Sequence, residues 1–282
     1  MNEHTVSRGE AGPFFATITP RPESISRKRK GRVRAAIMVT AILGSIGITV
    51  SPAHADMEDL QSPRSLHQSV GYLRTDEGTG YCSATLVSEN VVATAAHCYE
   101  GDVTDMWFYP AHDEASDPYG GWQGEKAVYS KDPGADDRDY AFIRLRNNED
   151  DQAPGDVIEP TLPVFNLNEE TFDGEVEVLG YTGDEFEGTT SDMDLEGCSI
   201  SDAVVVRNAD GDEVENEEYG AVRDEDTNCT DINDGASGGA WITQVSDGSW
   251  RLIGVHSGTG SDFKVGTLLG EGAQDAFEEA SE

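Results

Sequence analysis

Basic residues are scarce in this chain of 282 residues. It has 19 Lys and Arg against 55 Asp and Glu, which gives a net charge of −36 at pH 7. Residues 1–55 hold eight of the basic and three of the acidic residues, so the remainder carries a net charge of −41 and only three lysines, Lys126, Lys131 and Lys264. A surface of this charge repels phosphates, which excludes nucleic acid as a partner.

The excess of acidic charge also predicts a dependence on salt. Self-repulsion destabilises a compact chain in dilute buffer, whereas near 1 M salt the Debye length falls to about 3 Å and the repulsion is screened. We therefore hypothesise a protein adapted to high salt. An ordinary acidic exported protein is the alternative that the composition leaves open.

Long hydrophobic runs are also missing, with one exception near the N-terminus. Residues 27–34 are strongly basic, residues 35–50 are uncharged and largely apolar, and Ala53-His54-Ala55 supplies small residues for cleavage. This order is typical of a secretory signal peptide. We predict that residues 1–55 are a leader and signal that is removed, and that the rest is secreted, extracellular and free of the membrane. A membrane anchor is the alternative, but the run is short and is interrupted by glycines.

Helical periodicity is weak, and short β-prone runs separated by Gly, Asp and Pro dominate instead. A first set of expected strands covers 70–73, 81–87, 90–95, 106–109, 127–130 and 140–145. A second set covers 176–181, 197–206, 221–223, 240–245, 250–256 and 264–269, and a short helix is expected over 274–280. We therefore predict an all-β fold of two packed barrels of about six strands each, with the site in the cleft between them.

The connection over 146–155 is rich in Asn, Asp and Glu and marks a boundary between the two sets. We expect a mature N-terminal arm or short pro-segment over 56–69. An N-terminal barrel over 70–155 and a C-terminal barrel with its tail over 156–282 would follow.

Cysteine is limited to four residues. In an exported chain disulfides are the default, and pairing of sequence neighbours gives Cys82–Cys98 and Cys198–Cys229 as the simplest of three pairings. Closing loops of this size stabilises the fold by roughly 3–4 kcal/mol each in the chain-entropy account. No C-x-x-C or Cys/His cluster of zinc spacing is present, so we expect no metal and no cofactor.

Glycine concentrates around one serine, in the run Gly235-Ala236-Ser237-Gly238-Gly239. A loop almost free of side chains lets backbone N–H groups converge beside the hydroxyl, where they can stabilise the charge that develops on an attacked carbonyl oxygen. Ser237 is therefore a candidate nucleophile. A solvated Gly/Ser-rich turn is the plain alternative, so this interpretation depends on a base and an acid elsewhere in the chain.

Candidates for both roles lie in the first half. His97 ends the run Thr94-Ala95-Ala96-His97-Cys98, at a corner that a disulfide would brace. Asp139 directly precedes an apolar strand whose packing can fix its carboxylate, whereas Asp136 and Asp137 are competitors in an acidic loop. A carboxylate that accepts from one imidazole nitrogen orients the ring, so that the other nitrogen can take the serine proton. The order His97, Asp139, Ser237 thus indicates acyl transfer.

These motifs resemble those of the trypsin/chymotrypsin-like serine peptidases. The resemblance spans about residues 70–269 and rests on Cys82 with 94–98, on 139–143, on 178–181, on 235–239 and on 255–258. It implies two six-stranded antiparallel barrels and an endopeptidase that cleaves polypeptides through an acyl-enzyme. His97 would be the general base and then the general acid, Asp139 its orienting partner and Ser237 the nucleophile.

The resemblance also implies roles for neighbouring residues. The N–H groups of Gly235 and Ser237 would form the oxyanion hole. The side chain of Ser257 would hydrogen-bond near the orienting carboxylate, and the backbone of Ser257, Gly258 and Thr259 would pair with an extended substrate.

One departure from the family concerns activation. Digestive members carry an aspartate immediately before the serine, and it pairs with the N-terminus that zymogen cleavage creates. Ala236 stands at that position, so this ion pair cannot form and the oxyanion loop has to be held without it. The run Ile232-Asn233-x-Gly-x-Ser-Gly-Gly is closer to secreted bacterial members, either glutamyl-endopeptidase-like or HtrA-like.

The residue preferred before the cut depends on the wall of the specificity pocket. His256 falls there in the resemblance, as a histidine does in secreted bacterial glutamyl endopeptidases, and a protonatable imidazole can donate to a substrate carboxylate. Ile232 weakens this hypothesis of an acidic preference, because those enzymes usually offer a hydroxyl there. A pocket for small or apolar side chains, and a basic preference through Asp231, stay open.

Two further alternatives stay open. A non-catalytic trypsin-like protein would use the cleft only for binding. The acidic segment 113–117 suggests calcium, but its spacing singles out no site and solvated charge explains it equally well. We expect a monomer.

Overall fold

The computed structural model describes most of the chain beyond residue 56. The described residues are 57, 60–75, 81–99, 101–113, 116–129, 139–159, 161–164, 175–183, 193–200, 219–223, 229, 232–233, 235–259 and 263–282. Residues 51–282 form one compact unit. The predicted leader over 1–55, and the residues Asp136, Asp137 and Asp231, lie outside the described residues. Within the described part, no helix combines the length and the apolar character that crossing a bilayer requires.

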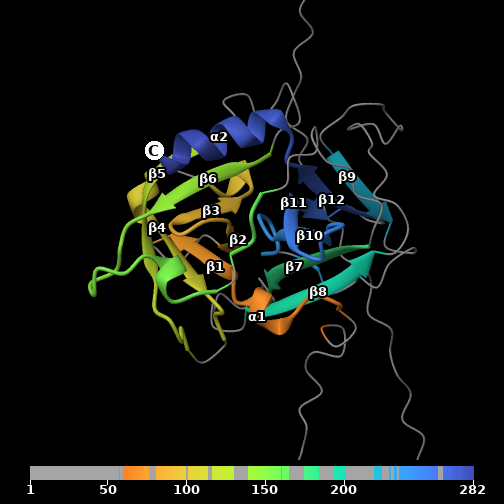
Figure 1. Ribbon diagram of the computed structural model, residues 1–282, viewed down its shortest axis with the longest axis horizontal. Helices are drawn as coiled ribbons and strands as arrows, with labels where there is room; N and C mark the ends of the chain where they lie inside the picture. Colours follow the sequence, from red (N-terminus) through yellow and green to blue (C-terminus); the bar gives the residue numbers. More distant parts are fainter. Residues whose placement is uncertain are drawn as a thin grey trace, which may run out of the picture. The chain divides into compact units, whose positions relative to one another are not determined.

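The first half of the described chain is a closed barrel of six antiparallel strands (Figure 1). In chain order these are β1 Val70–Thr75, β2 Tyr81–Leu86, β3 Val91–Thr94, β4 Met106–Pro110, β5 Trp122–Tyr129 and β6 Ala141–Leu145. Their order around the barrel is β1-β2-β3-β6-β5-β4, and β1 closes it by pairing with β4, for example Tyr72 with Tyr109. All six strands were expected from the sequence, although β5 begins earlier, at Trp122.

The second half is a six-stranded antiparallel sheet (Figure 1). Its strands are β7 Val176–Thr182, β8 Asp194–Ile200, β9 Tyr219–Arg223, β10 Ala240–Gln244, β11 Trp250–Thr259 and β12 Phe263–Leu268, in the order β8-β7-β10-β11-β12-β9. Residues 201–218, which join β8 to β9 and include the end of an expected strand, lie outside the described residues. The predicted fold class, all-β with two six-stranded antiparallel barrels, is confirmed, and among the described residues the second barrel is a six-stranded sheet.

Short helical elements complete the described secondary structure. They are α1 Arg64–His67, η2 Ala96–Cys98, η3 Val103–Asp105, η4 Pro154–Asp156 and α2 Glu271–Ser281. The C-terminal helix α2 was expected, and it packs on β5 and β6 of the first barrel (Figure 1). Phe277 meets Phe142 with 5.7 Å between ring centroids, and the Lys126 ammonium donates to the Glu279 carbonyl. The tail therefore contacts the opposite half from the one that precedes it in sequence.

The segment before β1 is docked on the second sheet. Glu177 of β7 is 1% exposed and accepts from the amides of Gln61 at 2.5 Å and Ser62 at 3.1 Å. Leu66 of α1 is buried in the core between the halves. The segment expected as an arm over 56–69 is thus, from residue 60 onward, integrated into the folded unit.

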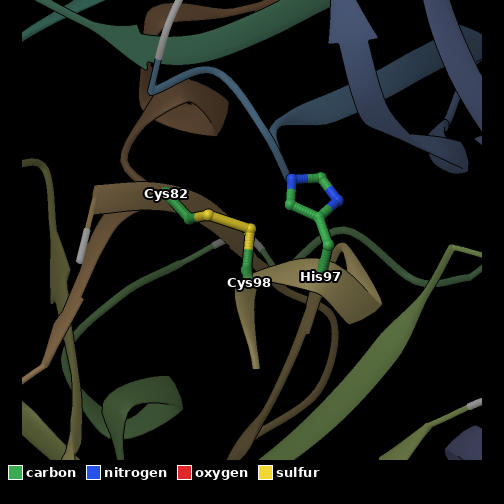
Figure 2. A group of neighbouring side chains, drawn as sticks. All are labelled: Cys82, His97 and Cys98. Carbon is green, nitrogen blue, oxygen red and sulfur yellow. A yellow bond between two sulfur atoms is a disulfide. The ribbon is translucent and has the colours of Figure 1, made fainter. Parts of the chain in front are cut away.

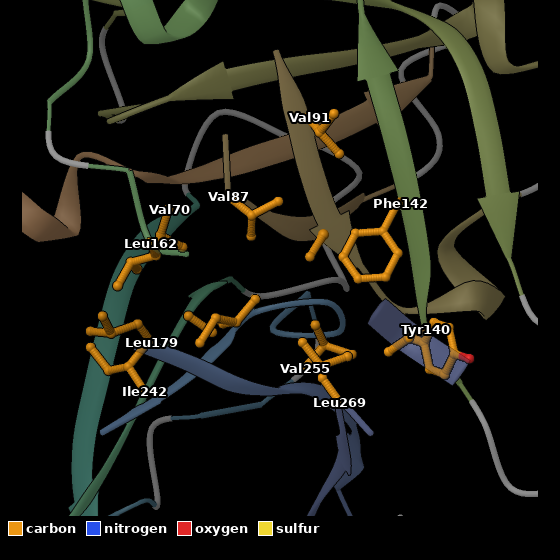
Figure 3. Close-up of a cluster of buried hydrophobic side chains, with 14 of the residues drawn as sticks. Val70, Val87, Val91, Tyr140, Phe142, Leu162, Leu179, Ile242, Val255 and Leu269 are labelled. Atoms are coloured by element: carbon orange, nitrogen blue, oxygen red, sulfur yellow. The ribbon is translucent and has the colours of Figure 1, made fainter. Parts of the chain in front are cut away.

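Strand alternation lets both halves bury two faces. Successive side chains of a strand point to opposite faces, so Val91 and Ala93 of β3 enter the layer between the halves while Val92 enters the interior of the first barrel. β10 alternates in the same way between the shared layer and the interior of the second sheet. The shared layer includes Val70, Val91, Phe142, Leu179, Ile242 and Val255 (Figure 3). This continuous packing fixes the two halves against each other at the site.

Both disulfides expected from sequence neighbours are formed. Cys82–Cys98 joins β2 to the η2 turn over a separation of 16 residues, and Cys198–Cys229 joins β8 to residue 229 over a separation of 31 residues. The first bridge braces the turn that carries His97 (Figure 2).

Candidate active site

A histidine and an aspartate meet at the ends of two paired strands. His97 lies on the η2 turn after β3, and Asp139 lies just before β6. Because β3 and β6 pair antiparallel up to Thr94 and Ala141, the turn and the carboxylate lie side by side. Asp139 Oδ2 lies 2.6 Å from His97 Nδ1, and Oδ1 accepts from the His97 amide at 2.9 Å. One carboxylate therefore contacts both the backbone and the ring of His97, and it contacts the ring through Nδ1 and not through Nε2.

The surroundings of Asp139 favour its ionised form. Burial alone would raise the pKa of Asp139, but hydrogen bonds and charge attraction from His97, with a hydrogen bond from the Ser257 side chain, hold this pKa below its ordinary value. Ser257 belongs to β11, so the carboxylate is held from both halves. The side chain of His97 is 46% exposed and that of Asp139 22%. The imidazole is thus open to a substrate, while its partner is shielded.

The glycine-rich loop lies at the junction of the two halves. Gly235 and Gly238 have φ values of 93° and 78°, in the left-handed region that favours glycine. A Cβ on Gly238 would collide with Thr94 Oγ1 and the Ser83 carbonyl, and would lie 2.9 Å from the Ala95 amide nitrogen. The residue after Ser237 is therefore pressed against the chain two residues before His97.

The Ser237 hydroxyl makes no hydrogen bond to any residue that the structure describes. Nucleophile–base bonds are often long when no substrate is bound. The side chain is half-buried, so it is accessible at the surface of the junction. The structure brings the Ser237 loop, His97 and Asp139 into one region without a closed hydrogen-bonded chain.

Ser83 of β2 makes two hydrogen bonds to the nucleophile loop and a third to β7. Its amide donates to the Ser237 carbonyl at 2.7 Å, and its Oγ donates to the Gly235 carbonyl at 3.1 Å and accepts from the Tyr181 amide at 2.7 Å. The side chain is fully buried. Sequence reasoning did not identify Ser83, because these partners lie 152 and 98 residues away. The only available signal was its place next to Cys82.

Two amides of the loop are available to a ligand. The amides of Ala236, Gly238 and Gly239 donate to backbone carbonyls. In contrast, no hydrogen bond between described residues uses the amides of Gly235 or Ser237. Two unused N–H groups beside a serine hydroxyl can stabilise a developing oxyanion.

Ala236 is packed against apolar neighbours. It is fully buried in a cluster with Trp241 and Ile253, and a Cβ on Gly180 would lie 2.9 Å from the Ala236 Cβ. An aspartate here would place a charge among apolar side chains, which is costly without a partner. Packing and the Ser83 hydrogen bonds therefore hold the loop where the digestive enzymes rely on an ion pair.

His256 borders the nucleophile loop. Its amide donates to the Gly239 carbonyl at 2.8 Å, and its carbonyl accepts from the Gly238 amide at 2.7 Å. The side chain is 1% exposed, and burial, followed by repulsion from Lys264 and His97, lowers the pKa of His256 to about 3. The imidazole is therefore neutral near pH 7, whereas the sequence analysis considered it as a protonatable donor.

The other residues that the sequence analysis assigned to substrate binding lie in two places. Ser257, Gly258 and Thr259 continue the strand through a β-bulge, and the Ser257 hydroxyl lies 2.6 Å from Thr267 Oγ1. Ile232 is 1% exposed and joins the apolar cluster of the second sheet. Isoleucine has no hydroxyl, so this position adds no polar group to the cluster.

One group of potential metal ligands occurs at the site. Atoms of Cys82, His97 and Cys98 lie within 4.8 Å of one another (Figure 2). Both sulfurs belong to the disulfide, so they do not offer thiolates to a metal. The three residues lie together because the disulfide joins β2 to the turn that carries His97.

Comparisons with known proteins agree with this geometry. Among solved structures, the chain is similar to the thermostable serine protease AL20 from an extremophilic microorganism (TM-score 0.58, 21% identity, 77% of this chain and 98% of that one). It is also similar to the protease Anisep from Arthrobacter nicotinovorans (0.58, 22%, 76% and 95%) and to a Glu endopeptidase (0.56, 17%, 77% and 92%). At these identities the likeness shows the fold. A search of curated proteins finds no match. The trypsin family description matches residues 61–267, so the chain belongs to the trypsin family of serine endopeptidases.

Proposed function

We propose that this chain is a secreted serine endopeptidase in which Ser237 is the nucleophile, His97 the general base and acid, and Asp139 the orienting carboxylate. The observation that carries the proposal is the 2.6 Å contact between Asp139 and His97 beside the loop of Ser237. Gly238 is packed against the Ala95 amide, which supports a short reach from the serine to the imidazole.

Acylation would begin when an extended substrate pairs with the backbone of residues 257–259. His97 Nε2 takes the proton of the Ser237 hydroxyl as its oxygen bonds to the scissile carbonyl carbon. The carbonyl oxygen becomes an oxyanion and accepts from the amides of Gly235 and Ser237. The imidazolium, stabilised by Asp139, then gives its proton to the leaving amine as the C–N bond breaks.

Deacylation would repeat these roles with water. His97 takes a proton from the attacking water, the same two amides stabilise the second oxyanion, and the proton returns to the Ser237 oxygen as the ester bond breaks. The peptide acid leaves and the serine is restored. The proposed acylation and deacylation steps use no cofactor.

An acidic preference before the cut is part of the proposal. His256 lies directly behind the nucleophile loop, where a neutral imidazole N–H can donate to a carboxylate. A Glu endopeptidase is among the proteins of similar fold, which supports the same direction.

Export and salt adaptation complete the proposal. Two disulfides, the basic and apolar leader and the predicted cut after Ala55 support secretion of the chain beyond residue 55. The net charge of −41 beyond residue 55 supports function in concentrated salt.

The experiment is a comparison of secreted wild type, Ser237→Ala and Ser249→Ala on a quenched peptide library in about 1 M salt. Ser249 lies in a surface hairpin, so its variant is the matched control. We expect Ser237→Ala alone to lose cleavage by several orders of magnitude. Equal cleavage by Ser237→Ala would refute the proposal, and tight peptide binding without cleavage by wild type would identify a non-catalytic binding protein.

A further inference from the structure

Lys264 is a buried cation that the catalytic mechanism leaves unused. It lies on β12 and is 2% exposed, among the largest fully buried side chains of the described chain. Lysine is almost never buried to this degree unless its charge is met by another group. It is also one of only three lysines beyond the predicted leader of a strongly acidic protein. Its burial, and its place on the strand that pairs with β11, make it a candidate for a role in the site.

The strand register places Lys264 on the interior face of the second sheet. On β12, Lys264 and Gly266 share a face, since side chains alternate along a strand. Gly266 lies opposite His256 in the β11–β12 pair, so His256 shares that face. A Cβ on Gly266 would lie 2.6 Å from Trp241 Cδ2, which marks this face as the interior.

The same register places Lys264 on the strand directly beside the proposed substrate strand. Lys264 lies opposite Thr259, the last residue of β11. The charge of Lys264 acts on His256, and His256 is in turn affected by His97 and Asp139. Lys264 is thus near the residues proposed to face the side chain that precedes the cut, on the inner side of the sheet.

We propose that Lys264 is the specificity-determining cation of the substrate pocket, where its ammonium binds the carboxylate of a glutamate or aspartate before the cut and His256 adds a neutral N–H donor. This inference rests on the proposed function, whose acidic preference it explains. An ammonium has three donors and a formal positive charge, which suits a carboxylate. His256 has a pKa of about 3 and so supplies no charge near pH 7. Ile232 adds no polar group.

The overall charge of the protein opposes the binding of an acidic peptide unless salt screens that charge. At low ionic strength a surface with a strong acidic excess repels an acidic peptide. Near 1 M salt the Debye length is about 3 Å, so this long-range repulsion is screened, whereas buried pairs are screened much less. The preference for an acidic residue is therefore expected to be expressed most fully in concentrated salt.

The test uses two peptides that differ only in Glu or Gln before the cut, so that size is matched and charge is not. For the secreted wild-type protein in about 1 M salt we expect kcat/KM to favour Glu by on the order of 10- to 100-fold. Lys264→Met is expected to bring the Glu/Gln ratio of kcat/KM near one, and Lys264→Arg is expected to keep a preference for Glu. His256→Gln is expected to lower kcat/KM for both peptides while the ratio persists. Lys126→Met, on the first barrel, is the matched control and keeps the wild-type ratio.

The outcomes separate this inference from the proposed function. Titration of Ser237 with a fluorophosphonate gives the concentration of competent enzyme for each variant. A wild-type ratio near one, or an unchanged ratio in Lys264→Met, overturns the role of Lys264 while the peptidase activity stands. If Lys264→Met does not fold, product inhibition of wild type by the matched peptide acids decides: tighter binding of the Glu product supports the inference, and equal binding overturns it. Absence of both labelling and cleavage in wild type would instead refute the proposed function.

Discussion

Replacing Ser83 by alanine tests whether the oxyanion loop is held from the first barrel. The Ser83 hydroxyl donates to the Gly235 carbonyl at 3.1 Å and accepts from the Tyr181 amide at 2.7 Å, in a fully buried site. Ser83→Ala leaves both backbone groups without this partner. Each buried group left unpaired costs about 1–3 kcal/mol, so we expect a loss of about 3 kcal/mol in the free energy of unfolding. The melting temperature should fall by about 6–12 °C.

The catalytic effect of Ser83→Ala should appear in the transition state. Loss of one oxyanion donor lowers kcat by about 10²–10³-fold, and a loosened donor should cost less, about 10- to 100-fold, with little change in KM. The assay is steady-state cleavage of a peptide series, together with the affinity of a peptidyl trifluoromethyl ketone that mimics the oxyanion. The affinity of the ketone should fall in parallel with kcat/KM, while a non-covalent product peptide should bind as before.

Thr85→Val is the matched control for Ser83→Ala. Thr85 lies two residues further along β2, is fully buried, and has a hydroxyl with no hydrogen-bond partner among the described residues. Its replacement should leave kcat unchanged and stability equal or slightly higher. If Ser83→Ala keeps its kcat within about twofold, or loses only what Thr85→Val loses, the loop is not held by Ser83 and the reasoning is refuted.

Three further predictions follow from charge, burial and disulfides. The melting temperature should rise by well over 10 °C between dilute buffer and about 1 M NaCl, as followed by circular dichroism, because the acidic excess is screened; a flat profile would argue against salt adaptation. Burial, followed by repulsion from Arg64, lowers the pKa of His67 to about 4. Between pH 6.5 and pH 4 the unfolded chain therefore binds a proton that the folded chain does not. The free energy of unfolding should fall by about 1.4 kcal/mol for each unit by which the pH is lowered through this range. Denaturant titrations in salt, repeated across this pH range, should show a free energy of unfolding that depends less on pH in His67→Gln, by that amount. An equal pH dependence in both proteins would contradict the prediction. Replacing Cys198 and Cys229 by serine opens a loop of 31 residues and should cost about 3–4 kcal/mol in urea unfolding, whereas an unchanged midpoint would show that the bridge adds nothing.

The sequence predicts the fold well because its strands are short, β-prone and separated by turn residues. Even the closing pair of the first barrel joins two expected strands, β1 and β4. The short helix α1 was not predicted, because four residues carry too little periodicity to be recognised. The docking of α2 on the first barrel could not be predicted either, since it depends on a contact between Phe142 and Phe277.

The site divides in the same way. His97, Asp139 and the Ser237 loop stand in local motifs whose chemistry can be stated from residue types alone. Ser83 and Lys264 stand in no motif, because their importance comes from burial and from partners on other strands. The neutral state of His256 likewise depends on its complete burial, which a single strand pattern does not specify.

The most direct test of the central claim is the covalent labelling of Ser237. The secreted full chain, folded in about 1 M salt, is incubated with a fluorophosphonate and mapped by mass spectrometry, with His97→Ala and heat-denatured protein as controls. The account predicts one adduct per chain, on Ser237, that requires the folded state and is formed far more slowly in His97→Ala. A folded protein that cleaves peptides without an adduct on Ser237, or that is labelled equally fast in His97→Ala, would contradict it.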